Sequence, residues 1–178
     1  MRTLARIGYH KRRRVPTLST YTSYALTGIK NREVLLAAIA TMGLQAQVHD
    51  KATRLSGYYR TDNRMTAQIV IPKSEFTKIG TYSYLDIGFL EGTDGTFTCQ
   101  TDGHLPTMVK DPKNPEGPMV KFEQAIQTAY ARVNGDAAVK TILTKTIPRL
   151  KQLGKIPANA TVRRQALPNG TTKVLVSY

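Results

Sequence analysis

Charge is segregated along this chain, and the segregation limits what each part can fold into. Residues 1–14 contain 6 basic side chains and residues 137–178 contain 8, and neither segment contains an aspartate or a glutamate. The segment between them is neutral, so the two ends account for the whole formal charge of +14. Cations without counter-charges repel one another and oppose compaction until an anion neutralises them. We therefore expect a neutral folded region flanked by two segments that bind a polyanion.

Length and apolar content predict the domain organisation. A chain of 178 residues can bury a substantial core. We predict a basic arm at residues 1–16 and a single α+β domain at residues 17–178, interrupted by a proline-rich loop at residues 104–118. The arm offers no apolar periodicity to the core, so we expect it to be detachable. An organellar transit peptide is the alternative interpretation of this acid-free, arginine-rich start.

The first part of the domain has the pattern of strands around one helix. Residues 17–28 are rich in threonine and tyrosine, which favours a strand. A helix follows, with Asn31 as its N-cap and Gly43 in the place of a left-handed C-terminal cap. Two more strands are predicted within residues 44–60 and 65–74, where apolar and polar residues alternate.

A hairpin is predicted over residues 82–103. Apolar residues alternate on both sides of Asp94-Gly95, and an Asp-Gly pair in this setting is typical of a tight hairpin turn. After the proline-rich loop, Pro118 is expected in the first turn of a second helix. That helix is predicted to end or bend at Asn134-Gly135.

The end of the chain predicts a further helix and a terminal hairpin. Residues 136–156 keep a helical apolar period despite Pro148, and basic side chains fill the other positions. Asn169-Gly170 predicts a hairpin turn within residues 161–178. The order of these elements predicts an α+β fold with a mainly antiparallel sheet and helices on one face.

Three blocks of the sequence carry a family resemblance. They are "LSTYTSYALTGIKNREVLLAAIATMGL" at residues 18–44, "YLDIGFLEGTDGTF" at residues 84–97 and "LPNGTTKVLVSY" at residues 167–178. In the order and pattern of these three blocks, the chain resembles the Ycf35 or DUF1257 family of cyanobacteria, plastids and some viruses. The resemblance covers residues 17–178 in interrupted blocks. Its motifs are structural rather than catalytic, so it transfers no site residue.

The chain also departs from that family. The family lacks an arm like residues 1–16, its loop is shorter, and the basic segment at residues 140–155 resembles an insertion. The family usually has a histidine after the first serine of its opening strand, where this chain has Thr20. Members are often encoded near an AAA-type ATPase, which implies a binding or adaptor role.

Candidate catalytic and metal-ligating residues are few. Cys99, Asp102 and His104 lie close together in the sequence, yet a closed metal site needs about four ligands and no second group is present. Asp86 with Asp94 or Glu91 is the only carboxylate set that suggests acid–base chemistry, and strand and turn roles explain it as well. Phosphate-binding loop signatures are absent from the sequence. We predict no enzyme, no metal and no cofactor.

Nucleic acid is the polyanion that the basic ends favour. Residues 1–16 contain no tryptophan or phenylalanine and few aliphatic residues, whereas a membrane-surface helix needs a broad apolar face. Arginine binds phosphate bidentately, and phosphate contacts alone supply affinity for nucleic acid. The predicted nucleic-acid-binding residues are Arg2, Arg6, Lys11, Arg12, Arg13, Arg14, Lys145, Arg149, Lys151, Lys155, Arg163 and Arg164.

The expected partner is RNA rather than DNA, within a large ribonucleoprotein such as a ribosome, together with other proteins of that assembly. No helix-turn-helix, zinc finger or basic-zipper pattern is present in the sequence. The alternative is an adaptor or structural subunit of a protein assembly, either an ATPase partner or a particle component. The single cysteine, Cys99, favours a reducing compartment, the cytoplasm or a plastid or mitochondrion, and no membrane partner is expected.

Overall fold

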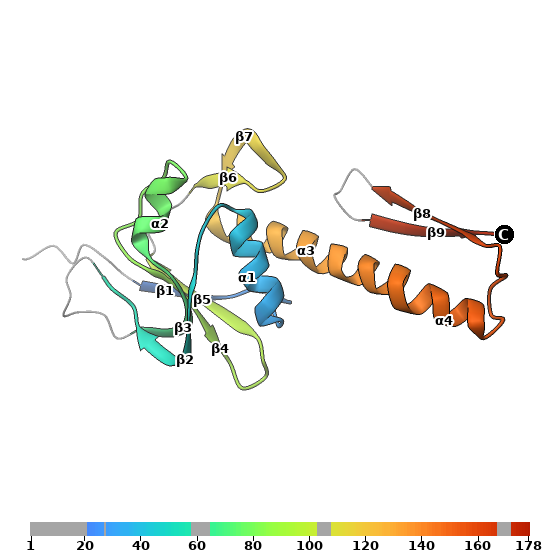
Figure 1. The fold of residues 1–178 in the computed structure, drawn as a ribbon. Helices are drawn as coiled ribbons and strands as arrows, with labels where there is room; N and C mark the ends of the chain where they lie inside the picture. Colours follow the sequence, from blue (N-terminus) through green and yellow to red (C-terminus); the bar gives the residue numbers. More distant parts are fainter. Residues whose placement is uncertain (1–20, 27, 58–64, 103–107, 167–171) are drawn as a thin grey trace, which may run out of the picture.

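The computed structural model describes residues 21–26, 28–57, 65–102, 108–166 and 172–178 (Figure 1). The arm at residues 1–16, with six of the predicted binding residues, lies outside the described residues. The described chain forms two parts, which we call the sheet domain (described residues up to 136) and the distal lobe (described residues from 137 onward). A long helix that starts against the sheet leads from the first part to the second.

An antiparallel sheet of five strands is the centre of the sheet domain. Its spatial order is β1-β5-β4-β3-β2, and every neighbouring pair runs antiparallel. The strands are β1 (Tyr21–Ala25), β2 (Gln47–Arg54), β3 (Thr66–Ile71), β4 (Ile87–Glu91) and β5 (Phe97–Asp102). Helices pack against this sheet, which confirms the predicted α+β fold with a mainly antiparallel sheet.

The main core lies between the sheet and two helices, α1 (Arg32–Thr41) and α3 (Phe122–Thr141). Alternate strand residues such as Ile69, Ile87 and Phe89 are fully buried beneath these helices, as expected from the two-residue repeat of a strand. The Phe122 ring at the start of α3 lies 6.5 Å from the Phe89 ring, centroid to centroid. Burial of such rings dominates the energetics of a core this size.

The opposite face of the sheet has a smaller apolar cluster, formed by Leu55, Ala67 and Val70. Gly88 in β4 lies against this cluster. A Cβ atom at position 88 would lie 2.6 Å from the Cβ of Ala67 and 2.8 Å from Cδ1 of Leu55, so only glycine fits. The glycine of "DIGF" therefore has a packing role.

Helix α1 begins and ends as predicted. The Asn31 side-chain oxygen accepts a hydrogen bond of 3.0 Å from the Val34 amide. Gly43 follows the helix with a φ of 77°, a conformation that favours glycine. The Tyr130 hydroxyl of α3 also accepts hydrogen bonds from the Lys30 and Asn31 amides, at 3.2 and 3.0 Å. Residues distant in the sequence thus help to fix the start of α1.

The β4–β5 hairpin also confirms the sequence analysis. Phe89 pairs with Cys99 and Glu91 with Phe97, and the turn between these strands contains Asp94 and Gly95. Gly95 has a φ of 74°. The Asp94 carboxylate accepts bonds from the amide and the hydroxyl of Thr96, which lower the pKa of Asp94.

The proline-rich segment differs from the prediction. Within residues 104–118, predicted as a loop, the described part forms strands that continue to residue 120: β6 (Val109–Asp111) and β7 (Asn114–Val120) pair antiparallel. Pro118 lies in β7 rather than in the first turn of a helix. On β7 the pairing shifts register between Asn114 and Met119. Pro115 and Pro118 lie between these two paired residues, where the strand needs no amide donor.

The predicted helix end at Asn134-Gly135 is wrong. Helix α3 runs through both residues and continues as a π-helical turn, η1 (Ile142–Thr146), and then as α4 (Ile147–Gln152). A glycine inside a helix costs only about 1 kcal/mol, which good helix formers on both sides can offset. Pro148 lacks an amide hydrogen and crowds the carbonyl four residues earlier. The wider π-helical turn before Pro148 is closed by a hydrogen bond from the Ile147 amide to the Ile142 carbonyl. This turn accommodates the proline, so the helix continues without a break.

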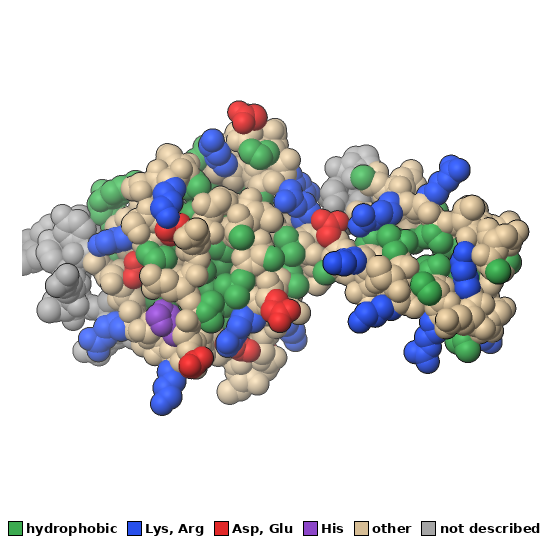
Figure 2. Space-filling model, viewed as in Figure 1, with side chains coloured by type: hydrophobic (Ala, Val, Ile, Leu, Met, Phe, Trp, Pro, Cys, Tyr) green, Lys and Arg blue, Asp and Glu red, His purple; other side chains and the backbone are tan. Residues whose placement is uncertain are grey.

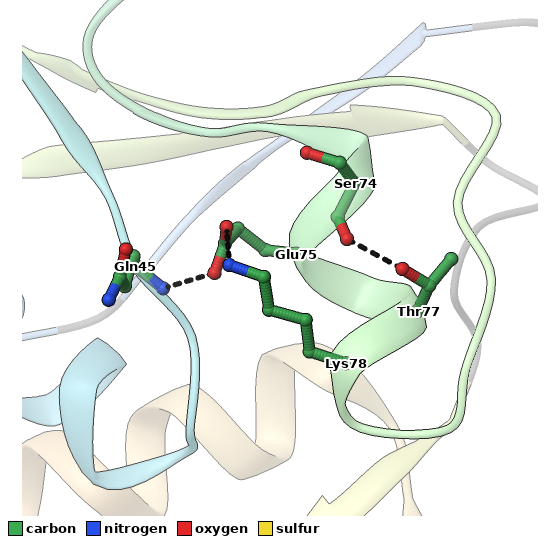
Figure 3. Close-up of polar contacts among 5 residues, drawn as sticks. All are labelled: Gln45, Ser74, Glu75, Thr77 and Lys78. Carbon is green, nitrogen blue, oxygen red and sulfur yellow. Dashed lines mark hydrogen bonds and ion pairs between the residues drawn. The ribbon is translucent and has the colours of Figure 1, made fainter.

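A short helix, α2 (Lys73–Lys78), follows β3 directly and was not predicted. Its Glu75 is buried and accepts a hydrogen bond of 3.0 Å from the Gln45 amide (Figure 3). Lys78 forms an ion pair with the same carboxylate at 2.5 Å. The bond from Lys78 lowers the pKa of Glu75, against the opposing effect of burial. Glu75 thus connects α2 to the segment that precedes β2.

Candidate nucleic-acid interface

The distal lobe consists of a helix and a hairpin that returns along it. After α4 the chain reverses and forms β8 (Thr161–Ala166) and β9 (Thr172–Ser177), which pair antiparallel as predicted. Figure 1 shows the hairpin beside the long helix and away from the sheet. The helix from Phe122 to Gln152 is about 45 Å long at 1.5 Å per residue. It therefore projects the second basic segment well beyond the sheet.

A small apolar interior holds the helix and hairpin of the distal lobe together. Val139 and Ile147 of the helix and Ala160 before β8 are buried. Val162, Val174 and Val176 of the hairpin are half-buried. Figure 2 shows hydrophobic side chains gathered between the helix and the hairpin. A two-stranded hairpin alone is marginally stable, so this contact is what keeps it folded.

The reversal between α4 and β8 is fixed by Lys151. Its ammonium group donates hydrogen bonds to the carbonyl oxygens of Ala158 and Ala160, at 2.8 and 2.9 Å. Gly154, with a φ of 65°, ends the helix just before the reversal. Lys151 was predicted to bind nucleic acid. Its half-buried position and its two carbonyl partners give it a structural role in the described lobe.

The other basic side chains of the distal lobe are exposed and form no ion pair with any described residue. They are Lys140, Lys145, Arg149, Lys155, Arg163, Arg164 and Lys173. Both ion pairs found among the described residues lie in the sheet domain: Arg32 with Glu91, and Lys78 with Glu75. On the face seen in Figure 2, Lys and Arg side chains project from the distal lobe, while acidic side chains lie over the sheet domain and its junction with the helix. The lobe is thus a cationic surface without internal neutralisation.

The structure brings some predicted binding residues together and separates others. Lys145 and Arg149 are four residues apart on the exposed side of the helix, so they lie about one turn apart. Arg163 pairs with Leu175, whereas Arg164 pairs with Val174 on the opposite face of the hairpin. The sequence presents these two arginines as equivalent neighbours. Lys173 was not among the predicted binding residues, and it lies on the face of Arg163 because the strand register pairs it with Gln165. A two-residue turn at Asn169-Gly170 would have placed Lys173 on the other face, so the sequence offered no signal for it.

The candidates for catalytic or metal chemistry have other roles in the described structure. Cys99 is completely buried in β5, and burial raises the pKa of its thiol. The side chain of Asp102 and all of His104 lie outside the described residues. No group of three metal-ligating side chains occurs among the residues that the structure describes.

The three carboxylates singled out in the sequence hold the fold together. Asp86 accepts bonds from the amides of Ser56 and Lys73, at 2.8 and 3.0 Å, which links the end of β2 to α2. Glu91 accepts a bond of 2.6 Å from Arg32. Asp94 shapes the β4–β5 turn. Each of the three carboxylates thus has a hydrogen-bond partner of its own in the described structure.

Two further findings bear on the class of this protein. Among the described residues, no helix is long and apolar enough to cross a membrane. Comparison of the chain with protein-family models, curated proteins and solved structures finds no match.

Proposed function

We propose that the protein is a non-enzymatic nucleic-acid-binding module, and that it contacts RNA within a large ribonucleoprotein assembly such as a ribosome. The observation that carries this proposal is the distal lobe, where the cations are exposed and no aspartate or glutamate occurs in residues 137–178. A solvated protein surface normally mixes charges of both signs, as the sheet domain does. The neutral sheet domain serves as the scaffold and contacts other proteins of the assembly.

Phosphate binding explains why such a surface is useful. Each cation that neutralises a phosphate releases condensed counterions, and this release supplies affinity that does not depend on base sequence. The basic arm at residues 1–14 adds six cations, and an extended segment of this length reaches roughly 45 to 50 Å at about 3.3 Å per residue. An arm and a projecting lobe together suit a protein that is embedded in folded RNA. A reducing compartment, the cytoplasm or an organelle, suits a chain with one cysteine.

A pair of exposed aromatic rings favours the second candidate, an adaptor or structural subunit of a protein assembly. Tyr82 and Tyr84 follow α2 in the sheet domain, with ring centroids 4.7 Å apart and exposures of 57% and 44%. Exposed tyrosines are common anchors at protein interfaces. The resemblance to the Ycf35 or DUF1257 family stays a prediction, and with it an AAA-type ATPase as the partner.

Matched charge variants of the full chain test the proposal. The first variant changes Lys145, Arg149 and Lys155 of the distal lobe to glutamine. The control changes Lys51, Lys110 and Lys121, which are exposed in the sheet domain, and removes the same charge. Binding to a fluorescent RNA is measured by anisotropy over a range of salt concentrations.

The lobe variant is expected to bind the RNA more weakly. Its salt slope, which is the slope of log affinity against log salt concentration, should be shallower by about 2 units, because up to three phosphate contacts are lost. The control is expected to change the slope by less than 1 unit. Equal effects of the two variants would show that net charge, and not the lobe, attracts the RNA. Purification of the native complex with and without nuclease separates the candidates, since partners that remain after nuclease favour the adaptor.

A further inference from the structure

The two faces of the β8–β9 hairpin differ in what covers them. Strand pairing places Val162 opposite Val176 and Arg164 opposite Val174, so these four side chains share one face. The three valines are half-buried, whereas Leu175, opposite Arg163, is the one half-buried side chain described on the other face. The face with the valines is therefore the one that packs toward the helix. Arg164 lies on that inner face and is exposed.

The outer face of the hairpin carries a polar and cationic group of side chains. Gln165 pairs directly with Lys173, and Arg163 lies two residues before Gln165 on the same face. Side chains in these direct and diagonal positions lie roughly 5 to 8 Å apart. All three are exposed, and neither cation forms an ion pair with a described residue. Two like charges at this spacing repel each other, and an anion held between them relieves the repulsion.

We infer that this outer face, formed by Arg163, Gln165 and Lys173, binds the sugar-phosphate backbone of a double-helical nucleic acid. The inference rests on the proposed function and adds which face acts and which form of nucleic acid it binds. Arginine and lysine neutralise phosphate groups, and the Gln165 amide can donate to a phosphate or a sugar oxygen. Arg164 takes no part, since it belongs to the inner face.

The composition and shape of the lobe favour a double helix over a single strand. Proteins that bind single strands stack the bases on aromatic side chains, and each stacked base adds substantially to affinity. Residues 137–178 contain one aromatic residue, Tyr178, at the last position of the chain. Most of these cations are instead held on a long helix and on a paired hairpin, so their backbone positions are fixed. A double helix suits such a surface, because its phosphates are also held in fixed positions.

The adjacent arginines provide a matched test in the full chain. Arg163→Gln and Arg164→Gln remove the same charge from neighbouring residues on opposite faces, and Lys173→Gln tests the second outer cation. Each variant is titrated with three fluorescent probes of equal length: an RNA duplex, a DNA duplex and a single-stranded RNA. Thermal melting by circular dichroism confirms that each variant is folded. Arg163→Lys and Arg164→Lys replace the glutamine variants if either of those unfolds, and they report the bidentate contribution of each guanidinium.

We expect Arg163→Gln and Lys173→Gln each to weaken duplex binding by about threefold to tenfold. Each of these two variants should also make the salt slope shallower by about 1 unit. The affinity of Arg164→Gln for the duplex should stay within twofold of that of the wild type. If the lysine pair is used, only Arg163→Lys should weaken binding. Equal losses at residues 163 and 164 overturn the assignment of the face and leave binding by the lobe intact. If single-stranded RNA binds as tightly as duplex RNA, the preference for a double helix is overturned.

Two further outcomes concern the proposed function itself. If the DNA duplex binds more tightly than the RNA duplex, the assignment of the outer face and the preference for a double helix are supported, and RNA as the partner is overturned. Wild-type protein that binds none of the three probes overturns the proposed function together with this inference. The two failures are therefore distinguishable.

Discussion

The sheet domain and the distal lobe differ in how completely they neutralise and bury their own side chains. In the sheet domain, residues such as Leu35, Ile69 and Phe89 are completely buried, and the carboxylates of Glu75 and Glu91 have cationic partners. In the distal lobe, the most buried described side chains, Val139 and Ala160, are still 5% exposed, and no exposed cation has a described acidic partner. The sheet domain thus has the more completely buried core. In the proposed function, the unpaired cations of the distal lobe contact the nucleic acid.

The largest effect expected from this comparison concerns core packing. Phe89→Ala should lower the free energy of unfolding by about 3–5 kcal/mol, because it leaves a cavity in a fully buried site. Ile147→Ala should cost less than about 2 kcal/mol, because the lobe can collapse around the lost atoms. Chemical denaturation of the two variants measures both values. Equal losses would mean that the lobe is packed as well as the sheet domain.

The second expected effect concerns the basic arm. Deletion of residues 1–14 should leave thermal melting of the remaining chain unchanged, because the segment has no apolar pattern to contribute to a core. The salt slope for RNA binding should become shallower by about 3 units if four of the six cations contact phosphate. An unchanged slope would favour a transit peptide or a protein-docking segment. Loss of cooperative melting would show that the arm belongs to the fold.

A third effect separates two lysines of the distal lobe that the sequence presents as alike. Lys151→Ala should destabilise the protein by about 1–2 kcal/mol, because it removes two bonds from a charged donor to the Ala158 and Ala160 carbonyls. Lys155→Ala should stay within about 0.5 kcal/mol, as exposed substitutions usually do. Denaturation midpoints and RNA affinity are compared for both. The contrast fails if Lys155→Ala is the more destabilising change.

The smallest expected effect concerns the paired charge of the sheet domain. Glu75→Gln should cost about 1 kcal/mol at pH 7, because the carboxylate loses its charged bond with Lys78 and weakens its bond with the Gln45 amide. The pKa of Glu75 is lowered from its ordinary value of 4.5. Its contribution is therefore complete above that value and is lost as the pH falls through the lowered pKa. Unfolding of wild type and variant between pH 7 and pH 3 should show the two stabilities converging in acid.

Local patterns in the sequence were sufficient for the elements that carry their own stop and turn signals. Asn31 marks the start of helix α1 and Gly43 its end, and Asp94-Gly95 forms the β4–β5 turn. Each of these residues acts through its own backbone or on a neighbouring amide, so the local sequence is enough to identify it. The prolines and Gly135 were misleading. A proline between paired positions or after a π-helical turn costs little, and that arrangement is visible only when the partner strand or the preceding turn is known.

The sequence by itself determined where the unneutralised charge lies and that it ends on a helix and a hairpin. Charge balance and the two-residue and 3.6-residue repeats are properties of the chain alone. Only the tertiary structure decided which cations remain available. Lys151 is engaged because the reversal after α4 brings two carbonyl oxygens to it. Arg163 and Arg164 are both exposed, and they differ because strand pairing places them on opposite faces of the hairpin, of which the face of Arg164 packs toward the helix.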